Sequence, residues 1–321
     1  MRSILFRADG NTQIGMGHLM RSLALATMLG DSFKRRFAIY QPTPSVKALL
    51  SEHGFPVISL GTQHIDELIQ HSQAEDIVVL DGYHFDEAFQ KVLRSKIHKL
   101  VFIDDLIFGH QVADVILNHT AGIPATEYEA EPYTQFLLGP RYALVNPLFR
   151  AAQLHTSAKD ILINLGGADI QNISHDLTNW LLRHYPECSL RVVLGSANPH
   201  VATFSHFPQD QVTLLQSLSV IQMAHEIAHC RLAIVSCSTI AYEVASIGRP
   251  FIGILTADNQ KRLAHFFVQE GLALGVLKLP LNPSMLPSLL NLNGFSDSIK
   301  RQRHYLDGLS GQRLREFFQT L

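Results

Sequence analysis

The first candidate for chemistry in this sequence is a histidine that follows two closely spaced glycines. Gly15 and Gly17 precede His18 in the segment Ile14-Gly-Met-Gly-His18, and apolar residues with helical spacing begin directly afterwards. Histidine exchanges a proton near neutral pH, and glycines let a ligand approach the backbone closely. The segment therefore predicts a general base beside a bound ligand. A tight turn that carries a surface or capping histidine is the alternative.

Polar residues also follow three apolar segments farther along the first half of the chain. These residues are Asp81-Gly82-Tyr83-His84, Asp104-Asp105 and Asn118-His119. Open α/β sheets bind their ligands where the carboxyl ends of the strands meet, so we expect these residues to line the same rim as His18. The alternative is that Asp81, Asp104 and Asn118 only form side-chain turns as the chain leaves each strand.

Two loops in the second half have the composition of an anion site. Gly166 and Gly167 follow an apolar segment, and exposed amides in such a loop can face a phosphate. Farther on, Ser238 or Thr239 can cap a helix whose amino end offers N–H groups and a positive dipole to a diphosphate. Glu243 lies one turn along that helix, where a carboxylate can accept both hydroxyls of a ribose. An ordinary solvated helix residue is the alternative for Glu243.

A third motif points to different chemistry. His225-Glu226-Ile-Ala-His229 matches H-E-x-x-H, in which two histidines one helical turn apart bind zinc and the glutamate acts as a base. The chain has 17 histidines, so a chance match of this kind is not rare. His229 stands three residues before an apolar strand, and no segment offers an evident third ligand. We therefore expect no metal site here.

The elements that would position these residues alternate between strand and helix. In the first half we expect strands at 4–6, 36–40, 56–60, 76–81, 99–104 and 113–118, with helices after His18 and at 44–54, 64–72 and 86–96. In the second half we expect strands at 160–165, 190–195, 211–215, 232–236 and 250–255, with helices at 172–184, 220–229, 239–247 and 260–270. Asn259 and Gln260 then open a helix at the mouth of the same crevice as Glu243. The alternation predicts an α/β protein with doubly wound parallel sheets.

The alternation lapses between about 142 and 160, which predicts a linker between two domains. With 321 residues the chain has the length of two ordinary domains, and we expect them at 1–146 and 147–321. The charged helical region at 296–321 is expected to pack on the surface, with a return to the first domain as one option.

Composition excludes several classes of function. Lys and Arg number 26 against 28 Asp and Glu, so the chain lacks the charge footprint of a nucleic-acid-binding protein. No uninterrupted apolar run is long enough for a membrane span, and Arg7 and Asp9 break the first apolar stretch too early for a signal peptide. The three cysteines, at 188, 230 and 237, include no C-x-x-C pair. We expect reduced thiols, a cytoplasmic location and no contact with a membrane.

Eight segments, in order and over nearly the whole chain, carry a resemblance to a known family. They are FRADGNTQIGMGHLMRSLALA, LDGYHF, VFIDDL, DVILNHTAG, LLGPRYALV, INLGGAD, SCSTIAYE and TADNQ. In these segments the chain resembles the UDP-sugar hydrolases of pseudaminic acid biosynthesis, a pathway associated with flagellin glycosylation. The G-x-G-H loop is also similar to that of the peptidoglycan N-acetylglucosaminyltransferase.

The resemblance implies a GT-B fold, with two Rossmann-like domains facing across a cleft. It implies that the N-terminal domain holds the sugar and the catalytic base, His18, and that the C-terminal domain holds UDP. The implied substrate is UDP-2,4-diacetamido-2,4,6-trideoxy-β-L-altropyranose, cleaved to UDP and free sugar. Cys237-Ser238 departs from the glycines that related nucleotide loops often carry. We expect substrate contacts from Asp9, Gly15, Gly17, Tyr83, Asn259 and Gln260, and nucleotide contacts from Gly166, Gly167, Ser238, Thr239 and Glu243.

Elementary chemistry is compatible with this reaction. Hydrolysis of a glycosyl phosphate needs a positioned water, a group that takes its proton, and donors for the charge on the departing diphosphate. His18 and two helix amino ends of the second domain would supply these without a metal or cofactor. We therefore predict an inverting, metal-independent, monomeric UDP-sugar hydrolase. A GT-B glycosyltransferase is the main alternative, and a zinc peptidase or a non-catalytic binding module comes after it.

Overall fold

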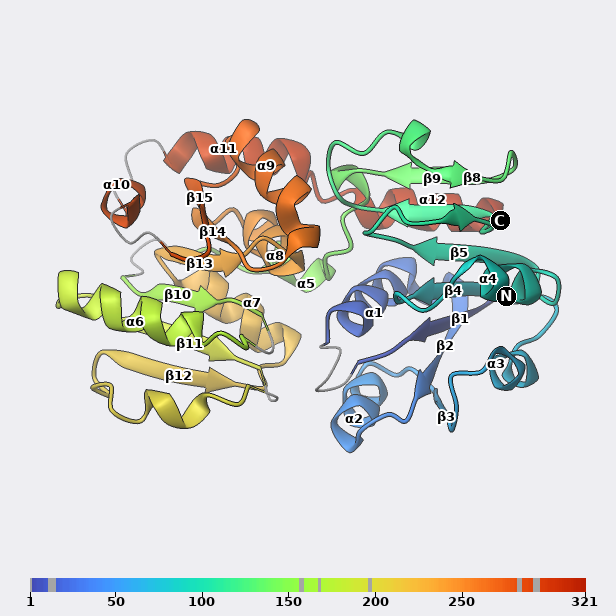
Figure 1. Cartoon of the computed structure of the whole chain (residues 1–321), viewed down its shortest axis with the longest axis horizontal. Coiled ribbons are helices and arrows are strands. Elements are labelled where there is room, and N and C mark those ends of the chain that lie inside the picture. The colour runs from blue at the N-terminus through green and yellow to red at the C-terminus, as the bar shows by residue number, and fades with distance from the viewer. Residues whose placement is uncertain are drawn as a thin grey trace. The chain divides into compact units, whose positions relative to one another are not determined.

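The computed structural model describes residues 2–10, 16–155, 159–166, 169–195, 198–281, 285–290 and 295–321 (Figure 1). The chain divides into two compact units. The first consists of Met1–Leu144 and Leu309–Leu321, and the second of Val145–Gly308. The sequence placed the boundary after residue 146, whereas the structure places it after Leu144 and adds the last segment of the chain to the first unit.

The first unit is built on a seven-stranded parallel sheet with the order β3-β2-β1-β4-β5-β7-β9. The order reverses between β1 and β4, which makes a switch point of the kind that binds ligands in doubly wound sheets. The strands are β1 (Arg2–Ala8), β2 (Phe33–Tyr40), β3 (Val57–Leu60), β4 (Ile77–Asp81), β5 (Lys99–Ile103), β7 (Val115–Asn118) and β9 (Gln135–Leu138). A two-stranded parallel pair, β6 (His110–Gln111) and β8 (Glu129–Ala130), lies outside this sheet.

Alternation along β1 explains why both faces of this sheet are covered. Ile4 and Phe6 belong to one hydrophobic core, whereas Leu5 belongs to another, because successive side chains of a strand point to opposite faces. Helices α1 (Gly17–Leu29) and α2 (Pro44–Glu52) contribute to the first core, and α3 (Ile65–His71) and α4 (Glu87–Arg94) to the second. The switch point is therefore held between two packed layers of helices.

Helix α12 (Ser310–Thr320) completes the first core from the far end of the sequence. Leu314 and Phe318 are fully buried in the core that also contains residues of α1, and α12 packs against α1. The guanidinium of Arg315 donates to the carbonyl oxygen of Met28 at 2.8 Å. The last helix is thus an integral part of the first unit.

The second unit repeats the same plan with six parallel strands in the order β12-β11-β10-β13-β14-β15. Its switch point lies between β10 and β13. The strands are β10 (Ile161–Asn164), β11 (Leu190–Leu194), β12 (Val212–Gln216), β13 (Leu232–Ser236), β14 (Phe251–Leu255) and β15 (Gly275–Lys278). The helices are α5 (Pro147–Ala151), α6 (Ile173–His184), α7 (Val220–His229), α8 (Thr239–Ile247), α9 (Lys261–Gln269), α10 (Leu286–Leu290) and α11 (Phe295–Tyr305).

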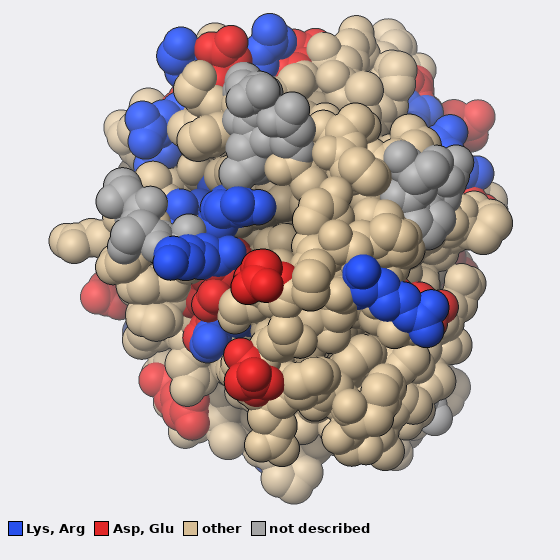
Figure 2. Space-filling view, turned by 90° about the vertical axis from the view of Figure 1, so that its left-hand side faces the viewer, with Lys and Arg blue, Asp and Glu red and all other residues tan. Residues whose placement is uncertain are grey.

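Charge is dispersed on the face of the second unit that carries α6 and α10. Figure 2 shows Lys and Arg side chains interspersed with Asp and Glu among mostly uncharged residues on this face. Among the helices that the structure describes, none has both the length and the apolar character that a membrane crossing requires.

Candidate active site

His18 lies in the first turn of α1, directly after β1 reaches the switch point of the first sheet. Helix α1 begins at Gly17, and its N-cap residue, Met16, makes no side-chain capping bond. A Cβ atom at Gly17 would have no heavy atom within 4 Å, so this glycine leaves open space beside the helix end. The side chain of His18 is 11 % exposed. His18 is therefore held by a packed helix and still borders solvent.

A hydrogen bond to Asp81 determines which nitrogen of His18 is available for chemistry. Nδ1 of His18 lies 2.7 Å from Oδ1 of Asp81, the last residue of β4. An ionised carboxylate only accepts hydrogen bonds, so Nδ1 carries the proton and Nε2 is left as an acceptor. The expectation that Asp81 lines the same rim as His18 is confirmed, and the pair has the form of a base with its orienting carboxylate.

Arg21 binds both oxygens of the Asp81 carboxylate. Its Nε and Nη2 donate to the two oxygens of Asp81 at 2.7 and 2.6 Å, and the hydroxyl of Ser22 donates to Oδ2 at 3.2 Å. Complete burial would raise the pKa of Asp81, but the charge of Arg21 and the hydrogen bonds from His18 and Arg21 outweigh it. The pKa of Asp81 therefore lies below its usual value, and this carboxyl group is ionised at neutral pH.

Tyr83 covers the imidazole from the loop that follows β4. The two rings meet edge to face with centroids 4.6 Å apart, and the tyrosine side chain is 58 % exposed. Its hydroxyl donates to Oδ2 of Asp105 at 3.4 Å, and Nη1 of Arg21 donates to the same oxygen at 2.8 Å. Partial burial and the charge of Asp105 raise the pKa of Tyr83 to about 12. Tyr83 is therefore a neutral hydrogen-bond donor beside the base.

A second histidine of this rim is neutral. Nδ1 of His119 accepts a hydrogen bond from the backbone N–H of Leu144 at 3.1 Å. Burial and the positive charge of Arg21 lower the pKa of His119 to about 4. It therefore adds no positive charge to the site at neutral pH.

Two further polar strand ends have structural partners instead. The carboxylate of Asp104 accepts from the backbone N–H of Leu106 and from the hydroxyl of Tyr128, and Oδ1 of Asn118 accepts from the N–H of Thr120. The bonds from the N–H groups of Leu106 and Thr120 are the local side-chain turns that the sequence left open as the alternative, whereas the bond from Tyr128 is a tertiary contact. Asp81 makes tertiary bonds instead and is the member of the three that belongs to the base.

Asp9 lies deeper in the same unit and is 2 % exposed. Its carboxylate pairs with the guanidinium of Arg7 and accepts from the N–H of Tyr40 at 2.9 Å and from Gln63 at 3.4 Å. The structure thus places Asp9 in a buried ion pair, and its predicted contact with substrate stays a prediction. Gly15, the other predicted residue of this loop, lies outside the described residues.

In the second unit, the glycine loop after β10 leads to a helix whose amino end is capped by a carboxylate. Gly166 follows β10 with φ of +98°, a conformation that favours glycine, and Gly167 lies outside the described residues. The carboxylate of Asp169 then accepts from the N–H groups of Ile173 and Ser174, both at 2.9 Å. Asp169 therefore caps the amino end of α6, and the expectation that two helix ends hold the diphosphate stays a prediction.

The amino end of α8 remains available to an anion. Ser238 is the N-cap residue, but its side chain makes no capping bond and instead lies 2.8 Å from the hydroxyl of Ser236. The first N–H groups of an α-helix have no partner within the helix, and the side chain of the N-cap residue Ser238 does not accept from them here. Thr239, which begins the helix, and Ser238 therefore lie where the sequence expected a diphosphate, next to the switch point between β10 and β13.

Glu243 lies one turn along α8 and carries a perturbed carboxyl group. Within the described part of the chain its side chain has no hydrogen bond or ion pair, and burial raises its pKa to about 8. Asn259 and Gln260 follow the neighbouring strand β14 in the short turn Asp258–Gln260. Oε1 of Gln260 accepts from the N–H and hydroxyl of Thr256 at 3.0 and 3.1 Å, which stabilises that turn. The exposed Asn259 extends the same edge of the sheet.

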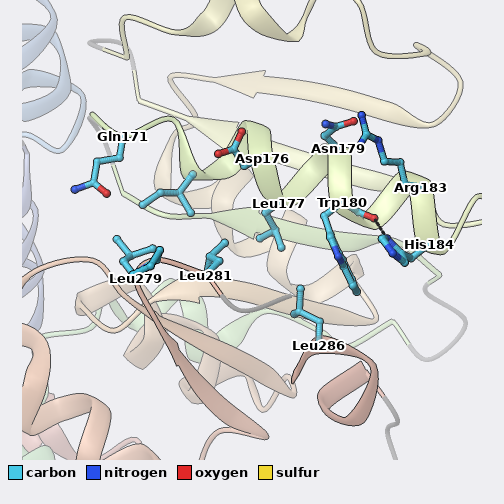
Figure 3. A pocket seen from close by; sticks show the side chains of 12 residues that line it. Gln171, Asp176, Leu177, Asn179, Trp180, Arg183, His184, Leu279, Leu281 and Leu286 are labelled. Atoms are coloured by element: carbon cyan, nitrogen blue, oxygen red, sulfur yellow. Dashed lines mark hydrogen bonds between the residues drawn. The ribbon is translucent and has the colours of Figure 1, made fainter. Parts of the chain in front are cut away.

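A cavity of about 450 Å³ lies elsewhere in this unit, between α6 and the segment after β15 (Figure 3). Trp180 and His184 stack within it with centroids 4.3 Å apart, and Nδ1 of His184 bonds to the carbonyl oxygen of Trp180. Leu279, Leu281 and Leu286 form its apolar wall (Figure 3). None of the predicted site residues lines this cavity.

The H-E-x-x-H motif lies on α7 but is not arranged as a metal centre. Glu226 is 8 % exposed and forms a two-bond ion pair with Arg191 of β11. The rings of His225 and His229 stack on each other with centroids 3.9 Å apart. Over the ranges that the structure describes, no group of three His, Cys, Asp or Glu side chains could hold a metal ion.

Sequence reasoning missed Arg21 and gave Asp105 no role. Arg21 follows His18 by three residues and so lies on the same face of α1, a spacing that the sequence displays. A cation on the buried face of a predicted helix is a signal in itself, because such a group needs a buried partner. Its partners are Asp81, which ends β4, and Asp105, which follows β5, and only the fold identifies them.

Comparison with known proteins confirms the resemblance seen in the sequence. The chain is 26 % identical over 276 residues to the UDP-2,4-diacetamido-2,4,6-trideoxy-beta-L-altropyranose hydrolase of Campylobacter jejuni. The aligned region covers 84 % of this chain and 97 % of that protein. It is 23 % identical over 279 residues to the spore coat polysaccharide biosynthesis protein SpsG of Bacillus subtilis, with 83 % and 81 % covered. No family model matches the chain.

Solved structures confirm the predicted GT-B fold with its two Rossmann-like domains. Acinetobacter baumannii MurG matches with a TM-score of 0.62 and 15 % identity over the whole of both chains. The calicheamicin glycosyltransferase CalG4 matches with a TM-score of 0.65 and 14 % identity over 100 % of this chain and 98 % of its own. Anabaena Alr3699/HepE, solved in complex with UDP and glucose, matches with a TM-score of 0.62 and 13 % identity over the whole of both chains.

Proposed function

We propose that this protein is a UDP-sugar hydrolase that cleaves UDP-2,4-diacetamido-2,4,6-trideoxy-β-L-altropyranose to UDP and the free sugar. The observation that carries the proposal is the buried His18–Asp81 pair at the switch point of the first unit, which leaves Nε2 of the imidazole as an acceptor. Similarity to the Campylobacter jejuni hydrolase over nearly its whole length supports the choice of substrate. A role in pseudaminic acid biosynthesis and flagellin glycosylation follows from that substrate.

In the proposed reaction, Nε2 of His18 takes a proton from a water molecule as the water oxygen attacks the anomeric carbon. The bond between that carbon and the diphosphate oxygen breaks on the opposite side, so the configuration inverts. The electron pair leaves with UDP, which needs no strong acid because a nucleoside diphosphate is stable as an anion. Asp81 stabilises the imidazolium that forms and stays ionised.

The second unit is the proposed UDP site. N–H groups in the first turn of α8, together with Ser238 and Thr239, would face the diphosphate, with Gly166 and Gly167 in the neighbouring loop. The carboxylate of Glu243, which has no side-chain hydrogen bond or ion pair among the described residues, would accept hydrogen bonds from the ribose hydroxyls. Substrate contacts are proposed for Asp9, Gly15, Gly17, Tyr83, Asn259 and Gln260. The reaction uses no cofactor or metal, and we propose a cytoplasmic monomer.

A glycosyltransferase is the second candidate, because MurG and CalG4 share the fold. In that reaction His18 would take its proton from an acceptor hydroxyl instead of water. The deciding experiment is incubation with the 2,4-diacetamido UDP-sugar in the absence of any acceptor, with detection of UDP and of reducing sugar. Equal release of both supports hydrolysis. Transfer to an added acceptor, without release in its absence, would establish the glycosyltransferase.

A further inference from the structure

The buried guanidinium of Arg21 links the candidate base to two carboxylates. Arg21 is 6 % exposed and lies one turn after His18 on α1. Its Nε and Nη2 bind both oxygens of Asp81, and its Nη1 binds Oδ2 of Asp105 at 2.8 Å. A fork of this kind fixes the plane of a carboxylate as well as its charge.

With Arg21 in place, all acceptor sites of the Asp81 carboxylate are hydrogen-bonded. Oδ1 accepts from His18 and Arg21, and Oδ2 accepts from Arg21 and Ser22. A carboxylate offers about four lone-pair sites, so these four donors fill it. Asp81 therefore cannot rotate away from His18 or take up the proton that the imidazole gains.

Loss of Arg21 would change the state of this pair. Burial raises the pKa of Asp81, and the charge and hydrogen bonds of Arg21 are the main forces against it. A protonated Asp81 can donate to Nδ1 of His18, and the imidazole proton would then move to Nε2. In that tautomer Nε2 is a donor and cannot accept a proton from water.

The other groups around Asp81 cannot replace this cation. Tyr83 after β4 is neutral, with a pKa of about 12, and His119 after β7 is neutral, with a pKa of about 4. Asp105 after β5 adds a second negative charge. On α1, His18 itself is the only other group that can become positive, and Ser22 is uncharged. Among these described neighbours, Arg21 is the permanent cation.

We propose that Arg21 is a positioning residue, which keeps Asp81 ionised and fills the remaining acceptor sites of its carboxylate. His18 then keeps its proton on Nδ1, and Nε2 can accept a proton from the reacting water. The part that concerns water rests on the proposed function, whereas the part that concerns the tautomer does not. Nη2 of Arg21 also lies 3.1 Å from Nδ1 of His18, so Arg21 acts on the reacting water only through Asp81 and the Nδ1 side of the imidazole.

The test is Arg21→Met, which keeps the length of the side chain and removes its charge and donors. The matched control is Arg94→Met. Nε and Nη2 of Arg94 also donate to both oxygens of a carboxylate in this unit, but this carboxylate belongs to Asp114 and makes no hydrogen bond with His18 in the described part of the chain. The imidazole tautomer is read from ¹⁵N NMR of histidine-labelled protein at pH 7, with the His18 signal identified from its loss in His18→Asn. We expect Nδ1–H in the wild type and in Arg94→Met, and Nε2–H in Arg21→Met.

Kinetics with the UDP-sugar give the second readout. In Arg21→Met we expect kcat at pH 7 to fall at least about tenfold, within the range that a positioned base supplies, with KM little changed. We also expect the acidic limb of the pH profile to move to higher pH, so that activity recovers in alkaline buffer as Asp81 ionises. A purely structural role would lower the melting temperature without moving this limb.

An unchanged His18 tautomer in Arg21→Met would overturn the proposal, whatever reaction the enzyme performs. If Arg21→Met does not fold, Arg21→Lys serves, because a lysine keeps the charge but cannot occupy both oxygens of Asp81 and reach Asp105. We then expect a smaller loss of kcat with the acidic limb shifted in the same direction, and a wild-type profile would overturn the proposal. Absence of UDP release by the wild type, with the tautomer change intact, would refute only the proposed function.

Discussion

The carboxyl group of Glu243 offers a quantitative test of the second unit, because burial raises its pKa to about 8 from an ordinary value of 4.5. Between these values the folded protein keeps a proton on Glu243 that the unfolded chain has released. The free energy of unfolding therefore falls as pH rises, by about 1.4 kcal/mol per pH unit, and levels off above the folded pKa. From pH 6 to pH 8 the loss amounts to about 2 kcal/mol.

Glu243→Gln keeps the shape of the side chain and removes its titration. We expect the variant to gain about 2 kcal/mol in unfolding free energy relative to the wild type between pH 6 and pH 8, measured by urea denaturation without ligand. The same change at Glu187, an exposed residue of the same unit, is the control and should give a constant difference over this range. A pH-independent difference for Glu243→Gln would refute the conclusion that α8 carries a partly buried, neutral carboxyl group.

The role proposed for Glu243 in binding UDP has its own readout. Ribose hydroxyls donate to the ionised carboxylate, so UDP binding should release a proton below pH 8, measurable by calorimetry in buffers of different ionisation enthalpy. Glu243→Ala should weaken UDP binding while changing kcat less, because the contact is shared by substrate and transition state. An unchanged affinity for UDP would remove Glu243 from the nucleotide site.

Three further outcomes are expected. His18→Asn should lower kcat by roughly a hundred- to ten-thousandfold with little change in UDP affinity or melting temperature, and near-normal turnover by the folded variant would rule out the base. EDTA should leave turnover unchanged and Glu226→Gln should affect stability alone, whereas stoichiometric zinc lost together with activity would contradict both. The pKa of His119 is lowered from 6.5 to about 4, so the unfolded chain takes up a proton at this histidine before the folded protein does as pH falls. Between these pH values the free energy of unfolding of the wild type should fall by about 3 kcal/mol, measured by urea denaturation. His119→Asn should lack this loss.

Most of the fold could be predicted from the spacing of apolar residues. Strand β13 has the predicted bounds, and the other expected strands are present with ends shifted by a residue or a few. Strands β9 and β15 were missed because each is short and lies beside turn residues. The expected linker contains α5, in which the side chain of Asn146 accepts from the N–H of Leu148 and Pro147 begins the helix. An Asn-Pro pair is compatible with a linker but can also start a helix, and here it starts α5.

The sequence predicts those parts of the candidate site that depend on where strands end and loops begin. The edge that carries His18, Asp81 and Tyr83 follows from where the apolar runs stop, and parallel topology brings these residues together. The partner of Arg21 could not be predicted, because it depends on the order of β1, β4 and β5 in the sheet. The capping of α6 by Asp169 depends in turn on the backbone path of a loop, which composition does not determine.

The return of the chain to the first unit has a consequence for biosynthesis. Leu314 and Phe318 lie in the core of that unit, yet the ribosome makes them after the whole of Val145–Gly308. The nascent first unit therefore lacks the α12 part of its first core until α12 is translated, and the apolar side chains that α12 covers stay exposed. The second unit is contiguous in sequence and can complete its fold earlier. The inserted unit thus precedes its host in the order of folding, and the interval between them is the period in which the unfinished first unit is most exposed to aggregation and proteolysis.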